Sequence, residues 1–207
     1  MKYLPKSTNK TVHPAKLKGH GEAGEAKVKS YISRLVVDKE HTKRIDNIII
    51  IDEYGKSHQI DHILIRPNGV FVIETKNWGG LVLGDSSSDT WTQIIGDNHY
   101  SLLNPLKQNR THCHVVNKVI GEEYSVNSLI VMTQNNAKKI GVDNVINLYH
   151  IGKYINSFDN GANLSIDDVS IIYQRLMSSK SDMTIEEHIN GIKKIEKFIL
   201  NYRFLFF

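Results

Sequence analysis

Residues 58–76 read HQIDHILIRPNGVFVIETK, and this stretch decides the fold. Two apolar runs rich in β-branched residues stand on either side of the Pro-Asn-Gly sequence at 67–69, which is a turn signal. We therefore predict two strands, over residues 58–66 and 70–76, that pair as a hairpin. Each strand also carries one acid inside its apolar run, and these two acids direct the functional interpretation.

Further helices and strands surround this hairpin. The apolar residues before it recur at helical spacing, and Asn104 followed by Pro105 is a strong helix start. The predicted elements are a helix over 21–37, strands over 47–52, 58–66, 70–76, 81–83, 91–95, 128–133 and 145–150, a helix over 105–120, and two helices that begin after Ser165 and Thr184, the second with a capping box. This order predicts an α/β fold, a mixed sheet flanked by helices with a C-terminal helical extension.

Length and composition set the domain organisation. The chain has 207 residues, 40% hydrophobic and 23% charged, as expected for one domain with a modest appendage. We predict a basic flexible arm over 1–18, the α/β domain over 19–158 and the helical extension over 159–207. No apolar stretch approaches the roughly 20 residues that span a bilayer, and the start lacks the apolar segment of a secretory signal. The single cysteine excludes an intramolecular disulfide, which fits the cytoplasmic location that we predict.

Positive charge is concentrated near the start of the chain. The net charge is only +4, but residues 1–21 contain five lysines and no acid. Such an arm can contact phosphates, and a solvated tail is the alternative interpretation. The candidate nucleic-acid contacts are Lys16, Lys18 and Lys107.

Acidic and basic side chains lie at the same end of the two predicted hairpin strands, away from the turn. Strand alternation places Asp61 on the same face as Ile63 and Ile65, and it places Glu74 and Lys76 together on one face of the next strand. Pairing through the turn then brings Asp61 close to Glu74. Inward-facing charges are unfavourable unless they are paired or bind a metal.

This combination has a chemical use. Two close carboxylates hold a hard divalent cation, which polarises a phosphate oxygen and lowers the pKa of a bound water. A neighbouring lysine can orient that water or stabilise the developing charge. Glu25 adds a third acid, because it shares a helical stripe with Val28 and Ile32. The alternative is that Glu22 and Glu25 only complement the helix dipole.

Gln108 and His112 lie one turn apart on the second helix and share a face. Gln108 can hydrogen-bond the lysine or a substrate phosphate, and a polar helix surface is the alternative for both residues. We assign no catalytic role to His112. Cys113 falls near the apolar stripe formed by Leu106, Val116 and Ile120, and it is predicted to be a buried, inert thiol. The run from His112 to His114 argues against zinc, because consecutive helical side chains diverge.

Taken together, these residues resemble the nuclease-related domain (NERD) family over about residues 19–158. The matching elements are Gly21-Glu-Ala-Gly-Glu25, Gln59-Ile-Asp61-His62, Asn68-Gly-Val-Phe-Val-Ile-Glu74-Thr-Lys76-Asn-Trp78-Gly79, Trp91 and Asn104-Pro-Leu-Lys-Gln108. The residue before Asp61 is Ile60 rather than proline, which is usual for this family.

The resemblance implies a restriction-endonuclease-like fold with a PD-(D/E)xK-type centre and Mg²⁺-dependent cleavage of phosphodiesters. It implies that Asp61 and Glu74 are metal ligands, that Lys76 is the catalytic lysine and that Glu25 is the acid of the first helix. Gln108 is similar to the helical glutamine of RecB-type nucleases. A tyrosine follows four positions later in those enzymes, and His112 takes its place here.

We therefore expect a nuclease that hydrolyses DNA through a metal-activated water, with one or two Mg²⁺ ions that Mn²⁺ can replace and with RNA as a second possible substrate. Glu25 would help to hold a second metal, or would hold the first through water. Two alternatives stay open: a nucleic-acid-binding module that has lost cleavage, and a structural or partner-binding protein in which Asp61, Glu74 and Lys76 form a buried ion network.

Overall fold

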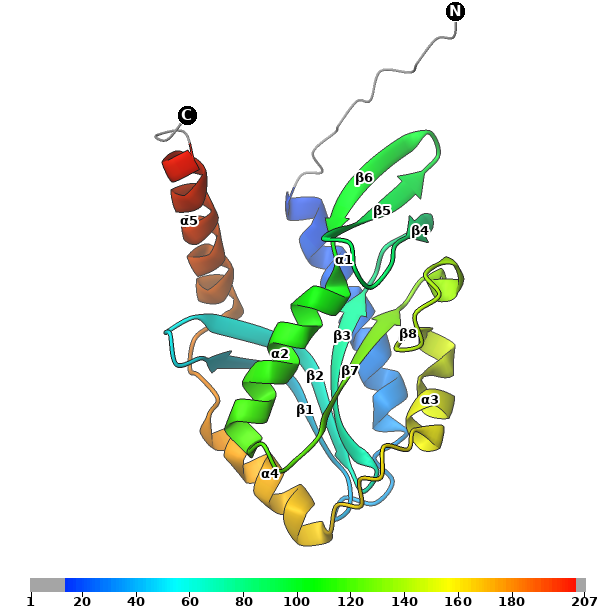
Figure 1. Ribbon diagram of the computed structural model, residues 1–207, viewed down its shortest axis with the longest axis vertical. Coiled ribbons are helices and arrows are strands. Elements are labelled where there is room, and N and C mark those ends of the chain that lie inside the picture. Colours follow the sequence, from blue (N-terminus) through cyan, green and yellow to red (C-terminus); the bar gives the residue numbers. More distant parts are fainter. Residues whose placement is uncertain (1–13, 204–207) are drawn as a thin grey trace, which may run out of the picture.

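The centre of the fold is a five-stranded sheet (Figure 1). The structure is a computed structural model that describes the backbone of residues 14–203 and the side-chain surroundings of residues 21–194. The strands, in spatial order, are β1 (Lys43–Ile51), β2 (Ser57–Arg66), β3 (Gly69–Lys76), β7 (Val126–Met132) and β8 (Val145–Asn147). The pairs β1–β2 and β2–β3 are antiparallel, whereas β3–β7 and β7–β8 are parallel, so the predicted mixed sheet is confirmed.

Helices cover both faces of this sheet (Figure 1). On one face α1 (Pro14–Ser33) and α3 (Ile151–Ser157) pack over a cluster that includes Val28, Ile73 and Val131. On the other face α2 (Pro105–Ile120) and α4 (Ile166–Ser178) pack over a separate cluster. The predicted α2 is confirmed at both ends, and Asn104 caps it by accepting the Leu106 N–H at 2.9 Å.

A small three-stranded sheet is inserted between β3 and α2. Its strands are β4 (Leu81–Leu83), β5 (Thr90–Ile95) and β6 (Asn98–Leu103). Trp91 anchors this sheet, because it is buried together with Val82 and Leu106. The strand β6 was not predicted, since its alternating exposure leaves a mostly polar sequence without an apolar run.

The C-terminal region contains the two predicted helices. The capping box of α4 is complete, with reciprocal bonds between Ser165 and Asp168. The second helix, α5 (Ile185–Arg203), starts after Thr184, whose hydroxyl accepts the Glu187 N–H at 3.2 Å. Short 3₁₀ turns occupy Ala137–Lys139 and Leu148–His150. No helix in the described part of the chain is both long and apolar enough to cross a bilayer.

Several predicted boundaries differ from the structure. The strand predicted over 47–52 begins already at Lys43, and the first helix, predicted to reach residue 37, ends at Ser33. The first helix begins at Pro14 rather than near Gly21, because proline at a helix start is favoured and not only a loop signal. The predicted arm over 1–18 therefore overlaps α1, while residues 1–13 lie outside the described structure. The strand predicted over 145–150 ends at Asn147, where the chain turns into α3.

Candidate active site

Glu74 and Lys76 stand at the end of β3, where the strand leaves the sheet. Glu74 is almost fully buried, and the Lys76 ammonium lies 2.5 Å from Glu74 Oε1. Lys76 Nζ also donates a hydrogen bond of 3.0 Å to Gln108 Oε1 on α2. It lies 5.5 Å from the centroid of the Trp78 ring. The predicted lysine is thus in contact with Glu74 of β3, with Gln108 of α2 and with Trp78 in the loop that follows β3.

Asp61 joins this group from β2. The last β2–β3 pair joins His62 to Ile73, so Asp61 and Glu74 are the next residues beyond it on the two strands. Asp61 Oδ2 accepts the backbone N–H of Thr75 at 2.8 Å, so its carboxylate turns sideways toward β3. The predicted proximity of the two acids is therefore present in the structure.

The backbone around Asp61 is not a regular strand. Asn47 of β1 has a φ of +52° and lies opposite Asp61, between the pairs Asp46–His62 and Ile48–Ile60. Ile60 and Ile63 are three positions apart but face the same core cluster. Simple alternation therefore fails at Asp61. Such irregularities re-aim single side chains, and here the result is a carboxylate directed along the sheet.

Glu25 approaches from α1 on the opposite face of the sheet. A close helix–strand contact makes this possible, because a Cβ on Gly24 would lie 2.8 Å from Asn77 Cβ and 3.3 Å from Thr75 Cγ2. Glu25 is half-buried, and its charge acts on both Asp61 and Lys76. All three predicted acids thus interact electrostatically at one end of the sheet.

The site combines three acids with a single lysine, so the negative charges are only partly neutralised. Burial, then the charges of Glu74 and Glu25, raise the pKa of Asp61 well above its usual range. Burial also acts to raise the pKa of Glu74, but Lys76 and His112 outweigh it and lower that pKa to about 2. Burial acts to lower the pKa of Lys76, but Glu74 and Asp61 more than offset it and raise that pKa. Glu74 and Lys76 therefore form a stable pair, and Asp61 carries the unrelieved repulsion.

This donor set fits a hard divalent cation. Carboxylate oxygens are the ligands such ions prefer, and Glu74 Oε2 is buried without a hydrogen-bond partner. A cation at this place would relieve the repulsion on Asp61. The side chains are not already gathered as a chelate, however: among residues 21–194 no three His, Cys, Asp or Glu side chains form a group that could hold one ion.

His112 corrects the expectation of a polar helix surface. It is buried, and its Nδ1 lies 3.3 Å from Glu74 Oε2. The sequence did hold a signal, since His112 shares the face of Gln108 one turn later. Its neighbour Cys113 is half-buried, and burial raises the pKa of its thiol to about 12, as an inert thiol requires.

The three candidate phosphate contacts differ in what the structure shows. Lys107 is half-exposed and pairs at 2.5 Å with Asp89, which directly precedes β5. Lys16 and Lys18 lie in the first turns of α1, and their side chains lie outside the described residues.

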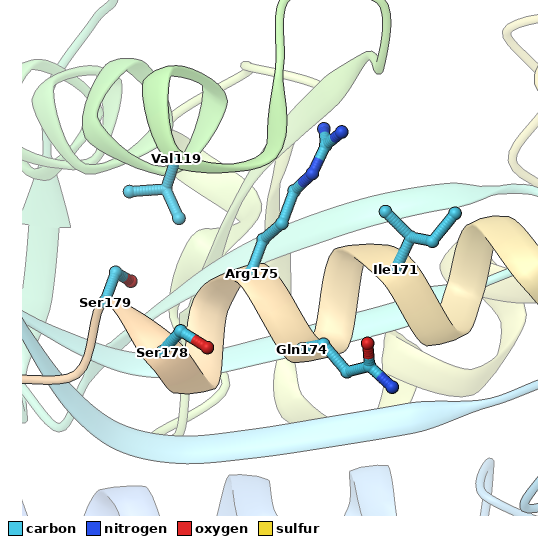
Figure 2. A pocket seen from close by; sticks show the side chains of 6 residues that line it. All are labelled: Val119, Ile171, Gln174, Arg175, Ser178 and Ser179. Atoms are coloured by element: carbon cyan, nitrogen blue, oxygen red, sulfur yellow. The ribbon is translucent and has the colours of Figure 1, made fainter.

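An open pocket lies between α2 and α4, away from these residues (Figure 2). Val119 faces it from α2, and Gln174 and Arg175 face it from α4. It shares no residue with the acidic group and is open to solvent, so it is not the candidate active site.

A model of the family described as "nuclease-related domain" matches residues 20–133, a segment that contains every acid of the site together with Lys76 and Gln108. The chain belongs to the NERD family. A relative from Bacillus anthracis, described as uncharacterized, is 32% identical over 176 residues, which cover 82% of each chain. No solved structure matches the chain. Membership of the NERD family establishes a nuclease-related domain, and the chemistry must be argued from the site.

Proposed function

We propose that this protein is a divalent-metal-dependent nuclease that hydrolyses DNA phosphodiester bonds. The observation that carries the proposal is the arrangement of Asp61, Glu74 and Lys76. Two carboxylates from paired strands meet at one end of the sheet, and the lysine beside them is fixed by Glu74 and Gln108. Membership of a nuclease-related family supports the same chemistry.

Asp61 and Glu74 would hold Mg²⁺, for which Mn²⁺ would substitute, and Glu25 would complete the acidic set. When bound, the metal supplies Lewis-acid polarisation of the phosphate and activates the attacking water. Lys76 stabilises the charge that develops on the phosphoryl oxygens, because its ammonium is already held in place. The Thr75 N–H fixes the orientation of the Asp61 carboxylate.

The proposed substrate is DNA, with RNA to be compared in the same assay. Lys16, Lys18 and Lys107 are the proposed phosphate contacts, and Lys107 would have to leave Asp89 to serve as one. The proposed location is the cytoplasm, in keeping with a single free cysteine.

The test is cleavage of end-labelled DNA by purified protein with Mg²⁺, with Mn²⁺ and with excess EDTA. We expect cleavage with either metal, none with EDTA, and none from the variant Asp61→Asn. His114→Ala is the matched control, since His114 lies exposed on α2 outside the site. Undiminished cleavage in EDTA would exclude the metal mechanism. DNA binding without cleavage under all conditions would favour the inactive binding module instead.

A further inference from the structure

The buried His112 stands against a catalytic acid without a role in the proposed chemistry. Its Nδ1 and Glu74 Oε2 are 3.3 Å apart, and both atoms are buried without a hydrogen-bond partner. Two orphaned polar atoms at this separation need only a small rotation of one side chain to form a hydrogen bond, and leaving them unpaired is unfavourable.

Two other buried histidines lie near the His112 imidazole. The His58 ring of β2 packs edge-on against it, with ring centroids 6.3 Å apart, and His58 Nε2 lies 2.8 Å from Asp52 Oδ2. His188 of α5 is also buried and lies 2.8 Å from Ser57 Oγ. Burial, followed by the charges of His58 and His112, lowers the pKa of His188, as expected if the three rings are close. The surroundings therefore restrict the positions that His112 can adopt.

The spacing of two side chains on α2 matches the spacing of two side chains on β3. Gln108 and His112 are four residues apart on α2, a rise of about 6.0 Å, and Glu74 and Lys76 are two residues apart on β3, a rise of about 6.6 Å. Gln108 contacts Lys76, and His112 contacts Glu74. One helical face can therefore hold both members of the pair at once. The same face of α2 continues one turn later with Val116, which shares a buried cluster with Val72.

We propose that His112 is a positioning residue that fixes the Glu74 carboxylate between itself at Oε2 and Lys76 at Oε1. The inference rests on the proposed function, because Glu74 needs a fixed orientation only if it binds a metal. A carboxylate oxygen has two lone pairs, so a bond from His112 leaves Glu74 able to bind a cation. Groups that orient a metal ligand typically change metal affinity or activity by about 10–100-fold when they are removed.

Three variants test this role. His112→Ala removes the contact, His112→Asn replaces Nδ1 with an amide nitrogen at nearly the same place, and His112→Gln places its amide nearer the former Nε2. The measurements are the Mn²⁺ dissociation constant of each protein by calorimetry, kcat and KM for DNA cleavage, and the thermal midpoint.

We expect His112→Ala to weaken Mn²⁺ binding and lower kcat by about 10-fold or more, with KM for DNA changed by less than about twofold. His112→Asn should recover most of both losses, and His112→Gln should not. If Asn and Gln behave alike, or if the losses follow thermal stability across the three variants, the role is structural packing and the proposal is wrong. If the wild type binds no Mn²⁺ and cleaves nothing, the proposed function fails and the positioning role fails with it. If the wild type does both and His112→Ala matches it, only the positioning role is refuted.

Discussion

The substitution Asp61→Asn separates a metal site from a structural ion network. The metal-free protein gathers Glu25, Asp61 and Glu74 around one ammonium, and the raised pKa of Asp61 shows that its charge is unfavourable there. Removing that charge should therefore relieve repulsion. A structural network predicts the opposite, since breaking a buried ion pair typically destabilises a protein by roughly 3–5 kcal/mol.

Two opposing effects determine how much Asp61→Asn changes the stability of the metal-free protein. Each unit by which folding raises the pKa of a carboxyl destabilises the folded state by about 1.4 kcal/mol at a pH above both pKa values. The amide oxygen introduced by Asp61→Asn would still accept the Thr75 N–H, and the weaker neutral hydrogen bond loses about 1 kcal/mol. We therefore expect the metal-free variant to be as stable as the wild type or more stable, with about 2–4 °C gained in thermal midpoint per kcal/mol.

The pH dependence has a defined sign. Because the pKa of Asp61 is raised on folding, its stabilising contribution is complete below the unfolded value, which is about 3.9, and is lost as pH rises through the folded value. The variant should lack this loss, so its advantage over the wild type should grow with pH in that interval and then level off.

Thermal melts of both proteins with EDTA and with Mg²⁺ provide the assay. The wild type should gain about 2.7 kcal/mol at a Mg²⁺ concentration 100 times its dissociation constant, and the variant should lose most of that gain. A clearly destabilised metal-free variant, together with a wild type that is indifferent to Mg²⁺, would refute the assignment of Asp61 as a ligand.

Three further predictions concern the catalytic lysine, the contact of α1 with the sheet, and the basic N-terminal segment. Lys76→Ala should lower turnover at least about 100-fold while DNA binding changes much less, and an equal loss of both would make Lys76 a phosphate contact only. Gly24→Ala should lower the thermal midpoint, because the new Cβ would clash with Asn77. Gly21→Ala is the control: its Cβ would lie 3.9 Å from Glu25, and alanine's higher helix propensity should raise the midpoint. Equal shifts for the two variants would contradict the close contact between α1 and the sheet. Deleting residues 1–13 removes three lysines and should flatten the salt dependence of DNA binding. The slope of log binding constant against log salt concentration should change by about 0.9 for each phosphate contact that is lost. An unchanged slope would make the segment a passive tail.

The parts of the fold that the sequence predicts are those with strong local signals. The turn at 67–69 and the apolar runs beside it are sufficient for the β2–β3 hairpin, whose register brings the backbone of Asp61 alongside that of Glu74. The cap at Asn104 likewise defines α2 and therefore the position of Gln108. In each case the determining interaction joins residues close together in the chain.

The parts that the sequence does not predict depend on tertiary contacts. The burial of His112 results from packing against β2 and β3, and the face that it shares with Gln108 does not by itself show that it is buried. The irregular backbone opposite Asp61 needs the conformation of Asn47 on another strand. The strand β6 is stabilised by pairing with β5, since its own sequence has little apolar character.

The C-terminal helices bear on the site although they lie beyond the family-matched segment at 20–133. Three side chains of α4 are fully buried in the core cluster that contains Val116 and Ile120 of α2: Val169, Ile172 and Leu176. Burying three such side chains contributes roughly 4.5–9 kcal/mol, which is comparable to the whole stability of a domain. The helix that presents Gln108 and His112 thus packs beside α4 on the same face of the sheet. The division at residue 158 stays a prediction about domains, but the packing makes α4 part of the unit that positions the candidate active site.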